Sequence, residues 1–188
     1  MSDNHILHCS VCDIAKSAPD PMAALEFVSD PAFGGLNMFV GKVRAQNHGR
    51  EVIGISYDIY QALALNVFRQ LAEEVQREFG PKVKLYVSHS CGRLKVGDIA
   101  VVVAAGTPHR DEAFRACRAL IEAVKHRSPI WKQEHFIDGN SEWSEGCSLC
   151  GHDATTPGTD QAHSQPHGPQ QHAQAGHHPH HHEQPGNE

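Results

Sequence analysis

The order of its alternating and helical segments restricts the fold of this chain more than any other feature of the sequence. Residues 36–44 and 52–60 alternate as strands joined by a polar loop at 45–51. Residues 62–79 follow with the period of an amphipathic helix, which Gly80-Pro81 ends. Residues 83–90 and 98–105 form a second strand pair, followed by a helix from about residue 109 and a strand at 130–134. A strand at 5–14 and a helix at 22–28, capped by Asp20 and opened by Pro21, precede them. The pattern predicts an α+β sheet with helices packed on one face.

The composition changes abruptly at Gly151 and divides the chain into two predicted parts. Residues 151–188 contain nine histidines and no aromatic or aliphatic residue larger than Ala. Such a segment buries too little apolar surface to offset the entropy of ordering, so it is predicted to be a disordered His-rich tail. Its imidazoles would bind Ni²⁺, Cu²⁺ or Zn²⁺ adventitiously. Residues 1–150 are long enough to bury the core of one catalytic domain.

The charge distribution excludes some partners. The net charge is −6, but residues 1–150 hold all 16 Lys and Arg against 18 of the 22 Asp and Glu, which gives −2. This nearly neutral domain lacks the basic surface that nucleic-acid binding requires. No apolar run approaches the length of a membrane span, and no signal peptide is visible at the N-terminus. We therefore expect a cytoplasmic protein that binds neither nucleic acid nor membrane.

Cations gather around the last predicted helix and strand. An apolar stripe of Phe114, Cys117, Ile121 and Val124 should pack inward and leave the basic residues on the flanks of the helix, which Pro129 ends. In the strand that follows, Ile130, Lys132 and Glu134 lie on one side and Trp131 on the other. Lys125 and Lys132 can therefore reach one pocket, where cations suit a phosphate, a carboxylate or an acyl intermediate. The alternative is a solvated basic face.

Five further residues are candidates for the same pocket. His109 and Arg110 lie at the start of the helix, where free N–H groups and a guanidinium favour anions. Phe39 lies on a strand beside Arg44, as a core residue or a pocket wall. Glu134 can pair with Lys132 across the pocket mouth.

Three blocks of the sequence resemble the catalytic (large) subunit family of molybdopterin synthase, in the family's order and over roughly residues 20–143. They are Phe39-Val40-Gly41-Lys42-Val43-Arg44 with Asn47 and Gly49; His89 with Gly92, Leu94 and Gly97-Asp98; and His109-Arg110, Ala113-Phe114, Lys125, Pro129-Ile130-Trp131-Lys132 and Glu134. The resemblance implies a hammerhead-like α/β fold with a mainly antiparallel sheet and packed helices.

The resemblance also implies an activity. The family is a sulfurtransferase that converts cyclic pyranopterin monophosphate, a pterin substrate, to molybdopterin. The sulfur comes from a thiocarboxylated ubiquitin-like small subunit with a C-terminal Gly-Gly, and the large subunit is expected as a homodimer within a heterotetramer. Lys125 would be the central catalytic group, as acid, base or transient acyl partner, and Lys132 would assist it. Arg44, His109 and Arg110 would hold the pterin phosphate or the thiocarboxylate, and no cofactor is required for catalysis.

The cysteines suggest a different activity. Cys9 with Cys12, and Cys147 with Cys150, form two C-x-x-C pairs that could hold a structural Zn²⁺ if the ends of the domain meet. Against this, residues 8–12 read as a strand, in which positions 9 and 12 face opposite sides. A metal-binding or metal-delivery protein that uses these pairs and the His-rich tail is the alternative function. A non-catalytic scaffold for the ubiquitin-like partner is a third, but it would need neither Lys125 nor Lys132.

Overall fold

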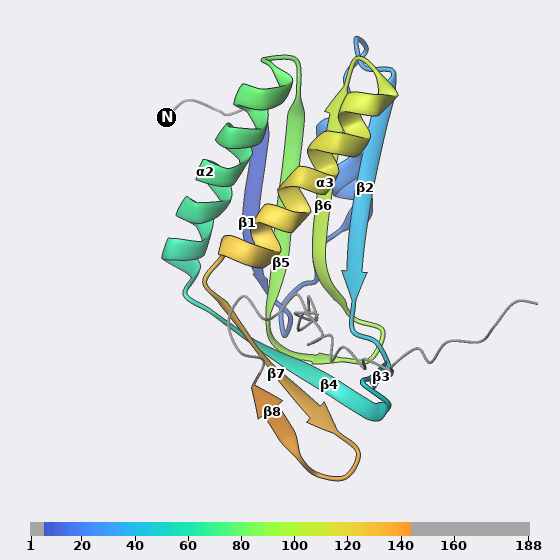
Figure 1. Ribbon diagram of the computed structural model, residues 1–188, viewed down its shortest axis with the longest axis vertical. Coiled ribbons are helices and arrows are strands. Elements are labelled where there is room, and N and C mark those ends of the chain that lie inside the picture. Colours follow the sequence, from blue (N-terminus) through green and yellow to red (C-terminus); the bar gives the residue numbers. More distant parts are fainter. Residues whose placement is uncertain (1–5, 144–188) are drawn as a thin grey trace, which may run out of the picture. The chain divides into compact units, whose positions relative to one another are not determined.

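The computed structural model describes residues 6–143, and they form the α+β fold that the sequence predicts (Figure 1). The predicted tail, Cys147 and Cys150 lie outside the described residues. The elements in chain order are β1 (Leu7–Asp13), α1 (Pro21–Val28), β2 (Gly35–Lys42), β3 (Gln46–Asn47), β4 (Arg50–Ile59), α2 (Gln61–Phe79), β5 (Lys84–Lys95), β6 (Ile99–Thr107), α3 (Arg110–Arg127), β7 (Ile130–Phe136) and β8 (Ser141–Trp143).

The sheet is mainly antiparallel, as expected, and its strand order is β2-β6-β5-β4-β7-β8. The long strand β5 connects its two halves. From Leu85 to Cys91, β5 pairs in parallel with β1, and from Gly92 to Lys95 it pairs antiparallel with β4. The change of partner falls at Gly92, whose positive φ of 94° is a conformation that glycine adopts without strain. The strands β4, β7 and β8 continue the sheet below the other half (Figure 1).

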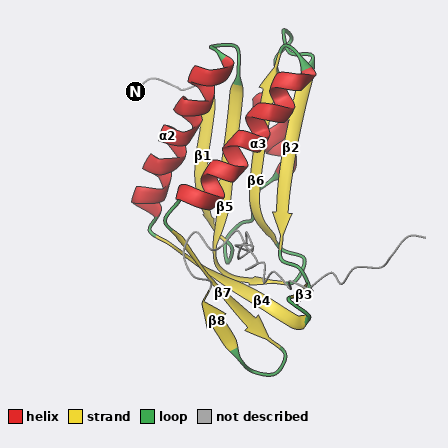
Figure 2. Cartoon of the chain, in the orientation of Figure 1, coloured by secondary structure: helices red, strands yellow, loops and turns green. Residues whose placement is uncertain are grey.

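The expectation that all helices cover one face of the sheet was wrong. Helices α2 and α3 lie side by side across one face (Figure 2). Their core includes Val87 and Val103 from the sheet. Helix α1 packs on the other face, against Tyr86, Val102 and Ala104. Side chains alternate along a strand, so a central strand that is apolar at successive positions needs cover on both faces.

The ends of α1 and α2 follow the predicted signals. The Asp20 side chain caps α1, because its Oδ1 accepts a hydrogen bond of 2.8 Å from the Met22 N–H. Helix α2 ends at Gly80, which has a φ of 86°. Within the described residues, no helix is long and apolar enough to cross a membrane.

The predicted inward stripe of α3 was wrong in one member. Cys117, Ile121 and Val124 are buried, but the Phe114 side chain is 56% exposed. The buried face of α3 also contains Ala113, Ala116 and Leu120, so it is centred away from Phe114. Small side chains at 113 and 116 let the helix approach the sheet closely, which apolar spacing alone does not reveal.

Candidate active site

A cavity of about 650 Å³ lies between α3 and the strands β2, β4, β5 and β7. Its walls are mostly apolar and include Ile55, Ile121, Val124 and Ile130. Polar side chains reach it from five segments of the chain: Arg44 and Asn47 from the β2–β4 connection, Tyr57 from β4, His89 from β5, Lys125 from α3, and Lys132 with Glu134 from β7. An apolar hollow with a few convergent polar groups is typical of a small-molecule site.

The end of α3 and the start of β7 bring Lys125 and Lys132 to this cavity, as the sequence predicted. Helix α3 ends at Arg127, and Ser128 and Pro129 turn the chain into β7. Along β7, Ile130, Lys132 and Glu134 line the cavity, whereas Trp131 lies on the other side of the strand and is exposed. The period-2 alternation of the strand therefore determines which residues of this segment reach the site.

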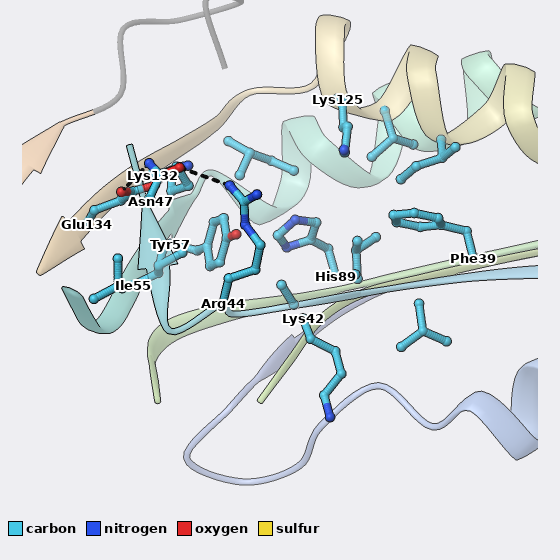
Figure 3. A pocket seen from close by; sticks show the side chains of 18 of the residues that line it. Phe39, Lys42, Arg44, Asn47, Ile55, Tyr57, His89, Lys125, Lys132 and Glu134 are labelled. Atoms are coloured by element: carbon cyan, nitrogen blue, oxygen red, sulfur yellow. Dashed lines mark hydrogen bonds and ion pairs between the residues drawn. The ribbon is translucent and has the colours of Figure 1, made fainter. Parts of the chain in front are cut away.

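A chain of hydrogen bonds fixes one side of the cavity. Lys132 Nζ donates to Glu134 Oε1 at 2.6 Å, and Asn47 Nδ2 donates to Glu134 Oε2 at 2.7 Å. Arg44 Nη2 donates to Asn47 Oδ1 at 2.9 Å (Figure 3). Burial raises the pKa of Glu134, but the hydrogen bonds from Lys132 and Asn47 outweigh it and leave this pKa below its ordinary value. Glu134 is therefore an anion that orients two cations.

Lys125 has different surroundings. Its Nζ lies 5.5 Å from the centre of the Phe39 ring, and no described carboxylate is within ion-pair distance of it. Figure 3 shows its amino group pointing from α3 into the cavity, whereas the Lys42 side chain points away from the other polar groups. Among the described lining residues, Lys125 is thus a cation that a ligand can engage without displacing a protein carboxylate.

The structure does not bring His109 and Arg110 to the same cavity. They lie at the other end of α3 and line a separate hollow with Gly34, Pro108 and Asp111. With 1.5 Å of rise per residue, a helix separates His109 from Lys125 by about 24 Å. Within one chain, the predicted residues therefore form two groups: Phe39, Arg44, Lys125, Lys132 and Glu134 at the cavity, and His109 with Arg110 at a distance from it.

Three cavity residues received no role from the sequence. Asn47 lies on the short strand β3, in a segment predicted to be a loop. Tyr57 alternates with Ile55 on the cavity face of β4, and that alternation could have identified it. His89 belongs to one of the three sequence blocks, which gave it no role, and it lines the cavity.

Cys9 and Cys12 lie on opposite faces of β1. Cys9 packs against the core beneath α2, and burial raises the pKa of its thiol to about 12. Cys12 Sγ lies on the other face, 3.4 Å from Ser88 Oγ. One ion cannot contact both sulfurs in this arrangement, because ligand bonds to zinc are only about 2.3 Å long. Within residues 6–143, no three His, Cys, Asp or Glu side chains are grouped to hold a metal ion.

Comparison with known sequences decides the family. The sequence model of the family described as "MoaE protein" matches residues 14–127. The chain belongs to the MoaE protein family. Among MoaE relatives, it is 43% identical over 148 residues to the molybdopterin synthase catalytic subunit of Synechococcus elongatus, across 79% of this chain and 87% of that protein.

Solved structures agree with this family. A molybdopterin synthase structure from Staphylococcus aureus superposes with a TM-score of 0.65 and 29% identity, and covers 71% of this chain and 93% of that one. A complex of subunits 1 and 2 of molybdopterin-converting factor from Helicobacter pylori superposes with a TM-score of 0.58 and 25% identity, over 73% and 90% of the two chains. The MoaE fold is therefore shared along most of the described chain.

Proposed function

We propose that this chain is the catalytic subunit of molybdopterin synthase, a sulfurtransferase that makes molybdopterin from cyclic pyranopterin monophosphate. One observation carries the proposal: Arg44, Lys125 and Lys132 line one cavity with apolar walls, and no cysteine is among its described lining residues. A sulfurtransferase without a cysteine at its site must receive its sulfur on another molecule. The thiocarboxylated C-terminus of a small ubiquitin-like subunit is such a donor, and the Helicobacter pylori relative is a complex of two subunits.

The cavity suits the charges of this reaction. In each transfer the thiocarboxylate sulfur bonds to a pterin carbon and gives an acyl intermediate. Water then cleaves the acyl bond, so the sulfur stays on the pterin and the partner's tail leaves as a carboxylate. Opening of the cyclic phosphate ester develops further negative charge. Fixed cations in a mostly apolar cavity stabilise such charge without reorganisation. The substrate, the tail and the intermediates are all anionic where they meet these cations.

The surroundings of the two lysines support different roles for them. Lys125 has no described carboxylate partner, so it is the central group, as an acid, a base or a transient acyl partner. Lys132 is held by Glu134 at 2.6 Å and therefore acts as a fixed positive charge beside it. Arg44, held through Asn47, binds the phosphate or the thiocarboxylate, and the Phe39 ring forms the wall beneath Lys125. Catalysis in this scheme requires no cofactor.

We further propose a homodimer within a heterotetramer, in which His109 and Arg110 serve the cavity of a second copy. The basis is their position at the far end of α3, where they are exposed and cannot reach the cavity of their own chain. Mixed dimers test this. Lys125→Ala and Arg110→Ala chains are each inactive alone, but random mixing restores roughly a quarter of wild-type activity, since half of the dimers then hold one intact site. No recovery after verified exchange of chains would refute the shared site.

Reconstitution tests the function itself. The protein is mixed with thiocarboxylated small subunit and cyclic pyranopterin monophosphate, and molybdopterin is measured. Lys125→Ala should abolish the product while the fold and partner binding remain, because alanine is at least as good a helix former as lysine. Lys82→Ala is the matched control, since Lys82 is exposed and does not line the cavity. Wild-type turnover by Lys125→Ala would remove the central role, and no product from the wild-type complex would refute the function.

The comparisons give no support to a metal-delivery protein. The cavity also argues against that function, because lysine ammonium and arginine guanidinium groups repel cations rather than bind them. The opposite faces of Cys9 and Cys12 argue against the predicted four-cysteine zinc site, whose other residues, Cys147 and Cys150, lie outside the described part of the chain. Metal binding by the His-rich tail stays a prediction. A cytoplasmic location also stays a prediction.

A further inference from the structure

His89 is a buried histidine with one nitrogen directed at the ligand space. It lies on β5 and is 6% exposed. Its Nδ1 is 2.8 Å from the carbonyl oxygen of Ser90. A carbonyl can only accept, so Nδ1 carries the proton and Nε2 presents a lone pair. Burial lowers the pKa of His89 to about 4 against the opposing effect of this hydrogen bond, and the ring is therefore neutral at pH 7.

No described residue satisfies His89 Nε2. The ring contacts Tyr57 edge-to-face with the ring centres 4.9 Å apart, and this contact fixes its orientation without using the nitrogen. Figure 3 shows the imidazole on the cavity floor between Phe39 and Arg44, beneath Lys125. Among the described residues, only Ser128 Oγ is a fully buried side-chain N or O atom without a partner, so His89 Nε2 is reached from the cavity. A ligand or water in the cavity can therefore donate the hydrogen bond that the protein does not supply.

We infer that His89 is a substrate-binding residue whose Nε2 accepts a hydrogen bond from an N–H group of the pterin ring system. The inference rests on the proposed function of the cavity and divides that cavity into two parts. Arg44, Lys125 and Lys132 take the anionic groups, the phosphate and the thiocarboxylate. The neutral floor takes the heterocycle, which is flat, uncharged and rich in N–H donors.

The chemistry of the floor favours a pterin over other parts of the substrates. Anionic ends are drawn to the cations, and a neutral lone pair on His89 would repel them. Phe39 and Ile130 both line the cavity, and a planar ring system would bury their apolar surface. Tyr57 adds a second neutral polar group, since burial and the charge of Glu134 raise its pKa to about 12. An acceptor beside a hydroxyl matches the adjacent N–H and C=O groups of a pterin edge.

Two substitutions separate hydrogen bonding from packing. His89→Phe keeps a flat ring against Tyr57 but has no acceptor, whereas His89→Gln places an amide oxygen near the position of Nε2. The binding probes are 6-hydroxymethylpterin, which has no phosphate, and inorganic phosphate, both titrated calorimetrically. The complete complex with thiocarboxylated small subunit gives KM for the cyclic pterin and kcat.

For His89→Phe we expect pterin affinity to fall about tenfold and KM to rise by a similar factor, with kcat changed less than about twofold. His89→Gln should stay within about threefold of the wild type in both, and phosphate affinity should be equal in all three proteins. Thermal unfolding checks the fold. If the Phe variant does not fold, a pterin methylated at its N–H groups decides, since the wild type should bind it about tenfold more weakly than the parent pterin.

Equal pterin affinity of the wild type and His89→Phe would overturn the inference, and so would a loss of kcat at unchanged KM. Weaker binding of the small subunit with unchanged pterin affinity would assign His89 to the partner's tail and also overturn it. If the proposed function itself is wrong, the result is different: the wild-type complex forms no molybdopterin, whatever the pterin titrations show.

Discussion

His89 should make the folded protein sensitive to acid in a way that one substitution removes. Its pKa is lowered from 6.5 to about 4 by burial, so the unfolded chain binds a proton there between these values and the folded protein does not. Stability that is present above pH 6.5 is therefore lost as the pH falls towards 4. The loss approaches about 1.4 kcal/mol per pH unit for one such group. Because this slope is smaller near each of the two pKa values, the loss between pH 6.5 and pH 4.5 is about 2 kcal/mol.

The measurement is urea unfolding of the wild type and of His89→Gln at several pH values in this range. Every other titrating group, including the tail histidines, is common to both proteins, and its contribution cancels in the difference between their free energies of unfolding. The wild type should lose about 2 kcal/mol more than the variant on acidification, whatever their difference at pH 7. If the free energies of unfolding of the two proteins changed in parallel with pH, His89 would not stay neutral in the folded protein. Its Nε2 would then have no free lone pair for a ligand in this pH range.

Three further predictions concern the network, the tail and the partner. Glu134→Gln removes the anion that holds Lys132 and should lower the free energy of unfolding at pH 7 by about 1–3 kcal/mol, as urea unfolding would show; an unchanged value would mean that the 2.6 Å contact adds nothing. Deletion of residues 151–188 should leave sulfur transfer unchanged and sharply reduce Ni²⁺ or Zn²⁺ retention; loss of activity at saturating partner would show that the tail is not independent. Lengthening the partner's Gly-Gly tail by one residue should misplace its reacting carbon by about 3.3–3.6 Å and slow single-turnover sulfur transfer. Salt should weaken the binding of the partner. Equal transfer rates for the native and the lengthened tail would show that the tail does not bind beside Lys125 and Lys132.

Local signals predicted the elements well. Asp20 and Pro21 marked the start of α1, Gly80 marked the end of α2, and Pro129 marked the turn into β7. These signals act within a few residues of the chain, so they can be read without knowing what packs against them. The alternation along β7 predicted that Lys132 and Glu134 would face one side and Trp131 the other.

Long-range packing explains what the sequence left open. Strand β2 pairs with β6 and not with the next long strand β4, and no local pattern specifies that choice. The three-residue strand β8 forms only because β7 offers it an edge. Helix α1 packs against the side of β6 that carries Val102. The residues of β6 form a continuous apolar run, so the sequence did not show which of them would face α1.

The site was predictable only where its residues are close in sequence. Lys125 and Lys132 are joined by one short turn, so the geometry of a helix end and a strand placed them together. His89 and Tyr57 are far apart in the sequence, and the fold brings their rings into contact. No residue near His89 in the sequence indicated that its Nε2 would have no protein partner. His109 and Arg110 look adjacent to the cluster in the sequence, but the length of α3 carries them away from it.

The pairing of β5, β6 and β7 with much earlier strands has a consequence for how the protein is made. Leu7 pairs with Leu85, Gly35 with Thr107, and Tyr57 with Gly92. Strands β1 and β4 therefore have no long partner until β5 leaves the ribosome, and β2 has none until β6 does. During synthesis the apolar side chains of these strands stay exposed to solvent, and chaperones bind exposed apolar surface of this kind. Strand β7 supplies Lys132 and Glu134 last. The cavity is therefore complete only once β7 has joined the sheet, because β7 is the last of its lining strands to be synthesised.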